Sequence, residues 1–280
     1  RRLVSFMPSG ASTYSPTGVR VCSFNLTGDG WLDCASLRIQ GKISNKHATT
    51  SLQLADGPHS LIQRIRFFCG GTMVEDVDVY NRSHQLFRRI LMSRDWVSND
   101  CVESGLQIAD PSAVSSPATA QLIGPNKSCA FSLQPLLGIL NCGKMLPLRL
   151  SGGCRLEITF ADAVDSVAAG SSTSYEAQEM SIRCAVSKLD SALESSYSSM
   201  LMNNRALTLR MTSFATQTAI LQPGASEMSI SLTRAYSRLN ALFISFQGSD
   251  AANTPPSHKH QTTSFLNPSA YVVGGVVTVS

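Results

Sequence analysis

An acidic cluster at residues 75–78 is the first place in this sequence where side chains could do chemistry. Glu75, Asp76 and Asp78 bring three carboxylates together, and such a group could coordinate a divalent cation or act as a pair of catalytic carboxylates. The cluster also stands directly before a segment with helical spacing, where Asp76 or Asp78 would cap the first turn. Because capping needs no ligand, the pattern favours a structural role over a metal or catalytic site.

Cysteines and histidines are the second group of chemically versatile side chains. The chain has eight cysteines and five histidines, but no two cysteines are three positions apart and the histidines form no cluster with them. His84 has no partner at the spacing of metal ligands. The wide cysteine spacing instead predicts buried free thiols in a protein made in a reducing compartment. The cysteines are Cys22, Cys34, Cys69, Cys101, Cys129, Cys142, Cys154 and Cys184.

The remaining candidate residues also favour structural roles. Trp31 and Trp96 are isolated in the sequence, which is typical of core or loop anchors rather than of a sugar-binding platform. Arg64 and Arg66 alternate along one apolar run and indicate a solvated strand face rather than a phosphate site. Nucleophile elbows, phosphate-binding loops, dinucleotide-binding glycine patterns and metalloprotease helices are absent from the sequence. We therefore expect no enzymatic activity, with no catalytic residues, no cofactor and no metal site.

The composition describes a protein with few charges. Charged residues make up 15% of the chain, whereas a soluble domain usually has about 25%. Such a surface is covered by small polar side chains or buried against partners. The net charge of +4 is too small for a dedicated nucleic-acid binder. The longest apolar stretches, 133–140 and 270–279, fall short of the roughly 20 residues that a membrane-spanning helix needs.

Alternation of apolar and polar residues dominates the chain and predicts β-strands. Helical spacing occurs at 78–92 and 189–202, and a short helix is expected at 134–140, where Pro135 suits a first turn. Long loops are expected at 93–128 and 247–269. The predicted strands are 19–26, 37–43, 61–68, 73–77, 145–150, 155–160, 180–186, 207–211, 214–220, 227–232, 239–246 and 270–279.

These elements predict an all-β protein. About ten strands with few helices indicate an antiparallel jelly-roll sandwich that carries short helical insertions. One face of each strand should then point into a shared core. The residues expected to face inward are Phe24, Leu26, Ile39, Ile65, Phe67, Leu148, Leu156, Ile158, Phe160, Ile182 and Cys184.

Four stretches, taken in order, resemble the double jelly-roll major capsid proteins of eukaryotic double-stranded DNA viruses, the group of nucleocytoplasmic large DNA viruses, virophages and polinton-like relatives. Residues 24–45 are similar to the opening strand pair of that group, and residues 65–87 to its strand–turn–strand followed by a helix. The most specific match is residues 131–160 (FSLQPLLGILNCGKMLPLRLSGGCRLEITF), where a short helix precedes a Leu-Pro-Leu strand. Residues 180–202 resemble the last strand of the first barrel and the helix that leads to the second.

The resemblance implies two parts in the chain. Residues 1–190 would form a first jelly roll, and residues 191–280 a linking helix with a second, shortened jelly-roll part. About 78 residues follow Met202 in the sequence, fewer than eight strands of about 5–6 residues plus their loops require. The second barrel is therefore expected to be incomplete, either because the protein is a shortened variant or because a segment is missing near Asn267 and Pro268.

The resemblance also implies a structural role in a virion. The protein would form homotrimeric, pseudo-hexameric capsomers of an icosahedral shell, contacting neighbouring capsomers, minor capsid proteins and penton proteins. Interfaces are expected in the long loops and in the terminal segments 1–18 and 270–280. Contact with packaged DNA would be weak and nonspecific, and synthesis would take place in the reducing cytoplasm or nucleus of a host cell. The alternative is a lectin-like or receptor-binding jelly-roll module without enzymatic activity.

Overall fold

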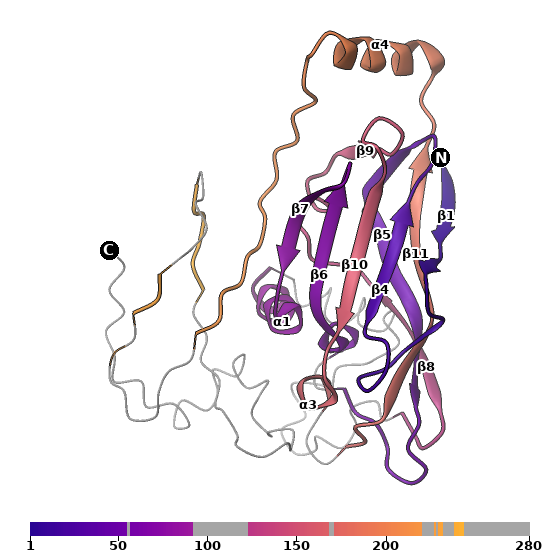
Figure 1. The fold of residues 1–280 in the computed structure, drawn as a ribbon, viewed down its shortest axis with the longest axis vertical. Coiled ribbons are helices and arrows are strands. Elements are labelled where there is room, and N and C mark those ends of the chain that lie inside the picture. The colour runs from indigo at the N-terminus through magenta and orange to yellow at the C-terminus, as the bar shows by residue number, and fades with distance from the viewer. Residues whose placement is uncertain are drawn as a thin grey trace.

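Two antiparallel β-sheets pack against each other and enclose a hydrophobic core (Figure 1). The computed structural model describes residues 1–54, 57–91, 123–167, 171–219, 227, 229–231 and 238–243. The first sheet contains β1 (Arg2–Phe6), β3 (Thr13–Tyr14), β5 (Trp31–Asn45), β8 (Ser128–Leu133), β9 (Met145–Pro147) and β11 (Tyr175–Ser187). The second sheet contains β2 (Pro8–Ser9), β4 (Val21–Leu26), β6 (Ile62–Cys69), β7 (Thr72–Val77) and β10 (Cys154–Phe160).

The order of the strands within each sheet defines the topology. The first sheet follows the path β1-β11-β5-β8, and the second follows β4-β10-β6-β7 with the short β2 beside β4. Counted along the chain, these eight long strands are arranged 1-8-3-6 in one sheet and 2-7-4-5 in the other. Two facing sheets in this order form the interlocked Greek keys of a jelly roll. The predicted antiparallel all-β jelly-roll sandwich is confirmed.

The period-two pattern of the strands places apolar side chains inside the sandwich. In β10, Leu156, Ile158 and Phe160 are at most 1% exposed, whereas the alternating Arg155, Glu157 and Thr159 are exposed or partly exposed. All eleven residues predicted to face inward are buried. The alternation in the sequence therefore identifies the core-facing side of these strands correctly.

Among the residues that the structure describes, four helical segments accompany the sheets: η1 (Pro58–Leu61), α1 (Tyr80–Leu91), α3 (Ala163–Ser166) and α4 (Ser191–Met202). The helices predicted at 78–92 and 189–202 are confirmed as α1 and α4. α4 begins where the Asp190 carboxylate accepts a hydrogen bond from the Ala192 N–H at 3.2 Å, as an N-cap does. Within the described part of the chain, no helix is long and apolar enough to cross a membrane.

The prediction of a short helix at 134–140 is wrong. These residues form turns and irregular backbone instead. The N–H groups of Gly138 and Ile139 donate to the Glu75 carboxylate rather than to carbonyls one helical turn earlier. An acceptor from another strand has therefore replaced the repeating hydrogen bonds that a helix requires.

Residues 203–219, here called the C-terminal strap, leave α4 as an extended chain and descend along the sandwich (Figure 1). The strands predicted at 207–211 and 214–220 are wrong as far as residue 219. Extended backbone becomes a strand only beside a hydrogen-bonded neighbour about 4.8 Å away, and the strap has no such partner among the described residues. Met211 and Phe214 instead pack their side chains against the core.

Most residues of the strands predicted after residue 220 lie outside the described part of the chain. The segments 227–232 and 239–246 fall partly outside the described residues, and 270–279 falls wholly outside. Residues 227, 229–231 and 238–243, which the structure does describe, form no strand. The second jelly-roll-like part over 191–280 and the domain boundary at residue 190 stay predictions.

Candidate functional site

The acidic cluster separates into three carboxylates with different partners. Glu75, in β7, is buried and accepts hydrogen bonds from Gly138 N at 2.9 Å and Ile139 N at 2.8 Å. Burial raises the pKa of Glu75, and these backbone donors, with the N–H of Phe214, oppose the rise. The carboxylate therefore ties β7 to the turn after β8 and to the C-terminal strap.

The other two acidic residues are also engaged by protein groups. Both oxygens of Asp76 bind the Arg64 guanidinium, at 2.8 Å from Nε and 2.6 Å from Nη2. The Asp78 carboxylate accepts from Val79 N at 2.9 Å, one residue before α1. Capping by Asp76 is therefore wrong because its carboxylate faces β6, while Asp78 bonds locally at the helix entry. The three carboxylates do not converge on a common point.

His84 lies in the packing between α1 and the sandwich. Its ring stacks on His59 of η1 with centroids 4.5 Å apart, and the Tyr80 ring lies 5.4 Å away. The Tyr80 hydroxyl accepts a hydrogen bond from Leu136 N at 2.7 Å. These contacts join α1 to η1 and to the segment after β8. In the part of the chain that the structure describes, no three His, Cys, Asp or Glu residues gather as a metal site.

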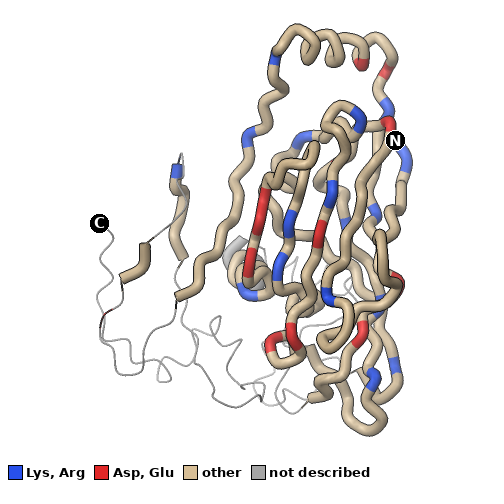
Figure 2. The backbone as a smooth tube through the Cα atoms, viewed as in Figure 1, with Lys and Arg blue, Asp and Glu red and all other residues tan. Residues whose placement is uncertain are grey.

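Charged residues on the outer face of the second sheet pair across neighbouring strands. Figure 2 shows acidic and basic segments alternating over β7, β6 and β10. Arg64 pairs with Asp76, and Arg66 pairs with Glu157 of β10. The predicted solvated face at Arg64 and Arg66 is thus a set of ion pairs within the sheet. Because these charges neutralise one another, the face can approach another surface without stranding many ions.

Trp31 attaches α4 to the sandwich. Its ring, in β5, contacts Tyr197 of α4 with centroids 4.9 Å apart and planes inclined at 50°. None of the residues of α4 is buried, and the helix lies across the end of the sandwich (Figure 1). Trp31 is therefore a packing anchor, as the sequence predicted, and Trp96 lies outside the described residues.

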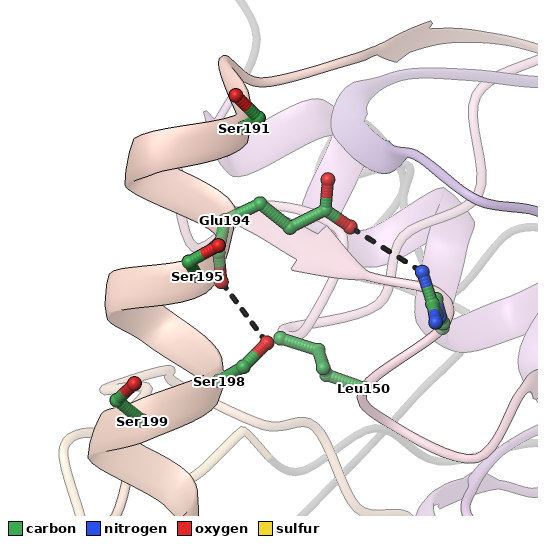
Figure 3. Close-up of a pocket in the computed structure, with 7 residues that line it drawn as sticks. Leu150, Ser191, Glu194, Ser195, Ser198 and Ser199 are labelled. Carbon is green, nitrogen blue, oxygen red and sulfur yellow. Dashed lines mark hydrogen bonds and ion pairs between the residues drawn. The ribbon is translucent and has the colours of Figure 1, made fainter.

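A shallow polar hollow of about 480 Å³ lies between α4 and the turn after β9 (Figure 3). On its floor Arg149 Nη1 lies 4.0 Å from Glu194 Oε1, and Ser198 Oγ donates to the Glu194 carbonyl at 3.0 Å. The sequence analysis did not predict this hollow. Its serines belong to no recognisable motif, and they line one surface only because they lie on the same helix. It offers hydroxyls and one ion pair to a polar partner. The lining residues are Arg149, Leu150, Ser191, Glu194, Ser195, Ser198 and Ser199.

The C-terminal strap binds the sandwich beside β7, an edge strand of the second sheet. The Thr216 hydroxyl donates to the Asp78 carbonyl, and the Phe214 ring contacts the Phe87 ring of α1 with centroids 4.5 Å apart. Phe243 contacts the same Phe87 ring at 5.3 Å. The chain beyond the jelly roll is thus held against its side, and the strap covers part of an edge that would otherwise be free to pair.

The N-terminal segment 1–18, which the sequence predicts to lie at an interface, places β1 at the outer edge of the first sheet. Leu3 and Met7 are 79% and 69% exposed there, while Arg1 forms an ion pair with Asp33. The other predicted interface segments, residues 247–269, 270–280 and most of 93–128, lie outside the described residues. Two exposed apolar side chains therefore lie at or beside this edge strand, where a partner could cover them.

Comparison of the chain with known proteins gives matches among solved structures only. No family model matches the sequence, and no curated protein sequence matches it. Among solved structures, the chain is similar to the PBCV-1 virus capsid, with 14% identity and a TM-score of 0.46 over 70% of this chain and 44% of that one.

Two further similar structures are those of the Sputnik virophage and of a mavirus protein. The Sputnik virophage structure matches with 10% identity and a TM-score of 0.43, covering 68% of this chain and 48% of that one. The mavirus major capsid protein matches with 9% identity and a TM-score of 0.39, covering 68% and 47%. The match spans less than half the length of each of them.

Proposed function

We propose that this chain is the jelly-roll part of a viral major capsid protein, with a structural rather than catalytic role. The observation that carries the proposal is the order of elements. A complete jelly roll, 1-8-3-6 facing 2-7-4-5, ends with β11 at Ser187 and continues directly into the exposed helix α4. The sequence motifs that resemble the double jelly-roll capsid group occur in the same order, including the helix that would lead to a second barrel.

The surface chemistry supports assembly with other copies. Only 15% of the residues are charged, and those on the outer face of the second sheet are largely paired with each other. Burying such a surface avoids the main cost of an interface, which is the desolvation of unpaired charges. The exposed Leu3 in β1 and Met7 just after it add apolar area that a neighbouring copy would cover.

The proposed assembly is a homotrimer that serves as a pseudo-hexameric capsomer of an icosahedral shell. Cyclic symmetry closes the interface at three copies, so the contact does not grow into a fibre. Minor capsid proteins and penton proteins are the proposed neighbours in the virion. With a net charge of +4, contact with packaged DNA would be weak, nonspecific and lost at high salt.

Light scattering and electron microscopy of the full chain test this proposal. We expect trimers at micromolar concentration and larger closed particles at higher concentration. A variant that carries both Leu3→Asp and Met7→Asp should remain folded by circular dichroism and lose the trimer. Met202→Asp, at an 86% exposed position on α4, is the matched control and should keep it. A wild-type chain that stays monomeric would overturn the proposal.

The lectin-like alternative makes a different prediction about the surface. A sugar site would present aromatic rings and carboxylates in one cleft. The hollow beside α4 is lined by serines, Arg149, Leu150 and Glu194, and Trp31 packs on Tyr197 instead of lining it. Glycan-array binding by a monomeric chain is the result that would favour this alternative.

A further inference from the structure

Two cysteines face each other across neighbouring strands of the second sheet. Cys69 is the last residue of β6 and Cys154 is the first residue of β10. The register of the two antiparallel strands pairs them directly, and their Sγ atoms lie 3.8 Å apart. Both are thiols in this structure. They stand 85 positions apart in the sequence, so no spacing pattern could have revealed the pair.

The hydrogen-bond pattern places this pair where a disulfide fits between antiparallel strands. The Gly70 N–H donates to the Gly153 carbonyl at 2.9 Å, a bond that flanks Cys69 and Cys154 and makes them a non-hydrogen-bonded pair. The Cα atoms of such pairs lie about 4.5 Å apart and their side chains are close together. Disulfides accept Cα separations of about 4.4–6.8 Å, so the two sulfurs can bond without moving the strands.

The two thiols differ in how easily a soluble reagent can reach them. Cys69 is partly exposed, whereas Cys154 is only 3% exposed. Cys69 Sγ lies 4.0 Å from the Ser151 carbonyl oxygen, and Cys154 Sγ lies 3.6 Å from Ser151 Oγ. Burial raises the pKa of the Cys154 thiol to about 12, which makes its thiolate scarce at neutral pH and its reaction slow. Cys69 is therefore the thiol that a soluble disulfide reaches first.

We propose that Cys69 and Cys154 form a reversible disulfide when the protein meets a small disulfide oxidant such as oxidised glutathione. The Cys69 thiolate attacks one glutathione sulfur, forms a mixed disulfide and releases one glutathione thiolate. The Cys154 thiolate then attacks the Cys69 sulfur, forms the Cys69–Cys154 bond and displaces the second glutathione thiolate. Two electrons and two protons pass from the cysteine pair to oxidised glutathione, which leaves as two molecules of the thiol.

The disulfide would close a covalent ring from residue 69 to residue 154 that contains β7, α1, β8 and β9. A cross-link around so long a loop restricts the unfolded chain strongly and stabilises the folded one. In a reducing cell the pair stays open, as the sequence predicts for this protein's thiols, and in oxidising surroundings it closes. This consequence holds whether or not the protein forms a capsid.

The test uses the full chain, purified with reductant, transferred to oxidised glutathione and then digested without reduction for mass spectrometry. We expect a peptide pair linked through Cys69 and Cys154, and a Tm about 5–10 °C above that of the reduced protein. Dithiothreitol should reverse both changes. Cys69→Ser and Cys154→Ser should each abolish them, while Cys129→Ser, at a partly exposed position in β8, should retain them.

Other patterns of oxidation would overturn the proposal. One is glutathione held on Cys69 with no link to Cys154. Another is a link between Cys34 and Cys142 that forms in place of the link between Cys69 and Cys154. Circular dichroism of the reduced variants checks that they fold. If Cys154→Ser does not fold because its hydroxyl is buried, Cys154→Ala serves in its place and should likewise show neither the link nor the rise in Tm.

Discussion

The rings of Trp31 and Tyr197 contact each other with centroids 4.9 Å apart, and this contact fastens a helix with no buried residue to the end of the sandwich. Trp31 belongs to β5, in the middle of the first sheet, and Tyr197 to α4, which follows the last strand. The position of the chain as it leaves the jelly roll therefore depends on one aromatic pair, with the Arg149–Glu194 pair at 4.0 Å beside it.

Replacing Tyr197 by alanine should release α4 and leave the sandwich folded. An aromatic pair contributes about 0.5–1.5 kcal/mol beyond its buried area, so the free energy of unfolding should fall by about that amount plus the contribution of the area that Tyr197 buries. Trp31 fluorescence should shift to longer wavelength as water reaches the ring, and hydrogen exchange in residues 191–202 should become faster. Ser195→Ala, on the same helix, is the control and should leave both signals unchanged.

Replacing Ile158 by aspartate should unfold or severely destabilise the jelly roll. Ile158 is fully buried in β10, and an unpaired carboxylate there costs several kcal/mol, roughly 3–5. Its neighbour Thr159 is partly exposed and faces Val21 and Arg64 in the register of the adjacent strands. Thr159→Asp should therefore cost much less. Equal destabilisation of the two variants in urea unfolding would contradict the assignment of the core face.

The sequence correctly predicted those strands and helices whose own pattern of apolar residues indicates their structure. Alternation in β10 identified its buried face, and helical spacing located α1 and α4. It missed β1 to β3, where short segments become strands only by pairing with β11 and β4. It shortened β5 to 37–43, because Trp31 and its neighbours join the sheet by pairing with β9 and β11.

Long-range pairings explain what the sequence could not predict at the candidate site. Glu75 suggested a cation ligand or a catalytic carboxylate, yet its partners Gly138 and Ile139 lie more than 60 positions away. The same long-range hydrogen bonds explain why residues 134–140 form turns instead of the predicted helix. The strap was predicted as strands because its residues have high β-propensity, but propensity does not supply a neighbouring strand.

Breaking the Arg64–Asp76 pair from the arginine side should destabilise the second sheet. Asp76 is 9% exposed, and Arg64→Ala removes the guanidinium that binds both of its carboxylate oxygens, at a cost of about 1–3 kcal/mol. Lys42→Ala, which breaks the exposed pair with Glu179, should cost about 0–1 kcal/mol. Chemical denaturation of Arg64→Ala, of Asp76→Ala and of the variant that carries both changes gives the coupling energy of the pair. A coupling energy near zero would show that the bidentate Arg64–Asp76 contact does not stabilise the folded protein.

The Glu75 carboxyl group should make stability depend on pH in a defined direction. Burial raises its pKa in the folded protein, above the value of about 4.3 expected in the unfolded chain. The folded state then holds this proton more tightly than the unfolded state, so stability from this group is fully present below about pH 4.3 and is lost as pH rises through the folded pKa. Glu75→Gln has a neutral side chain at every pH, so its free energy of unfolding should not show this decrease with rising pH.

The measurement is urea unfolding of wild type and Glu75→Gln from pH 4 to pH 8. The wild-type free energy of unfolding should fall relative to that of the variant as pH rises, and the difference should level off once Glu75 is ionised in both states. Glu157→Gln, whose carboxylate is paired with Arg66 on the outer face, is the control for a general loss of charge. A wild type that gains stability over Glu75→Gln with rising pH would show that the Gly138, Ile139 and Phe214 N–H groups outweigh burial.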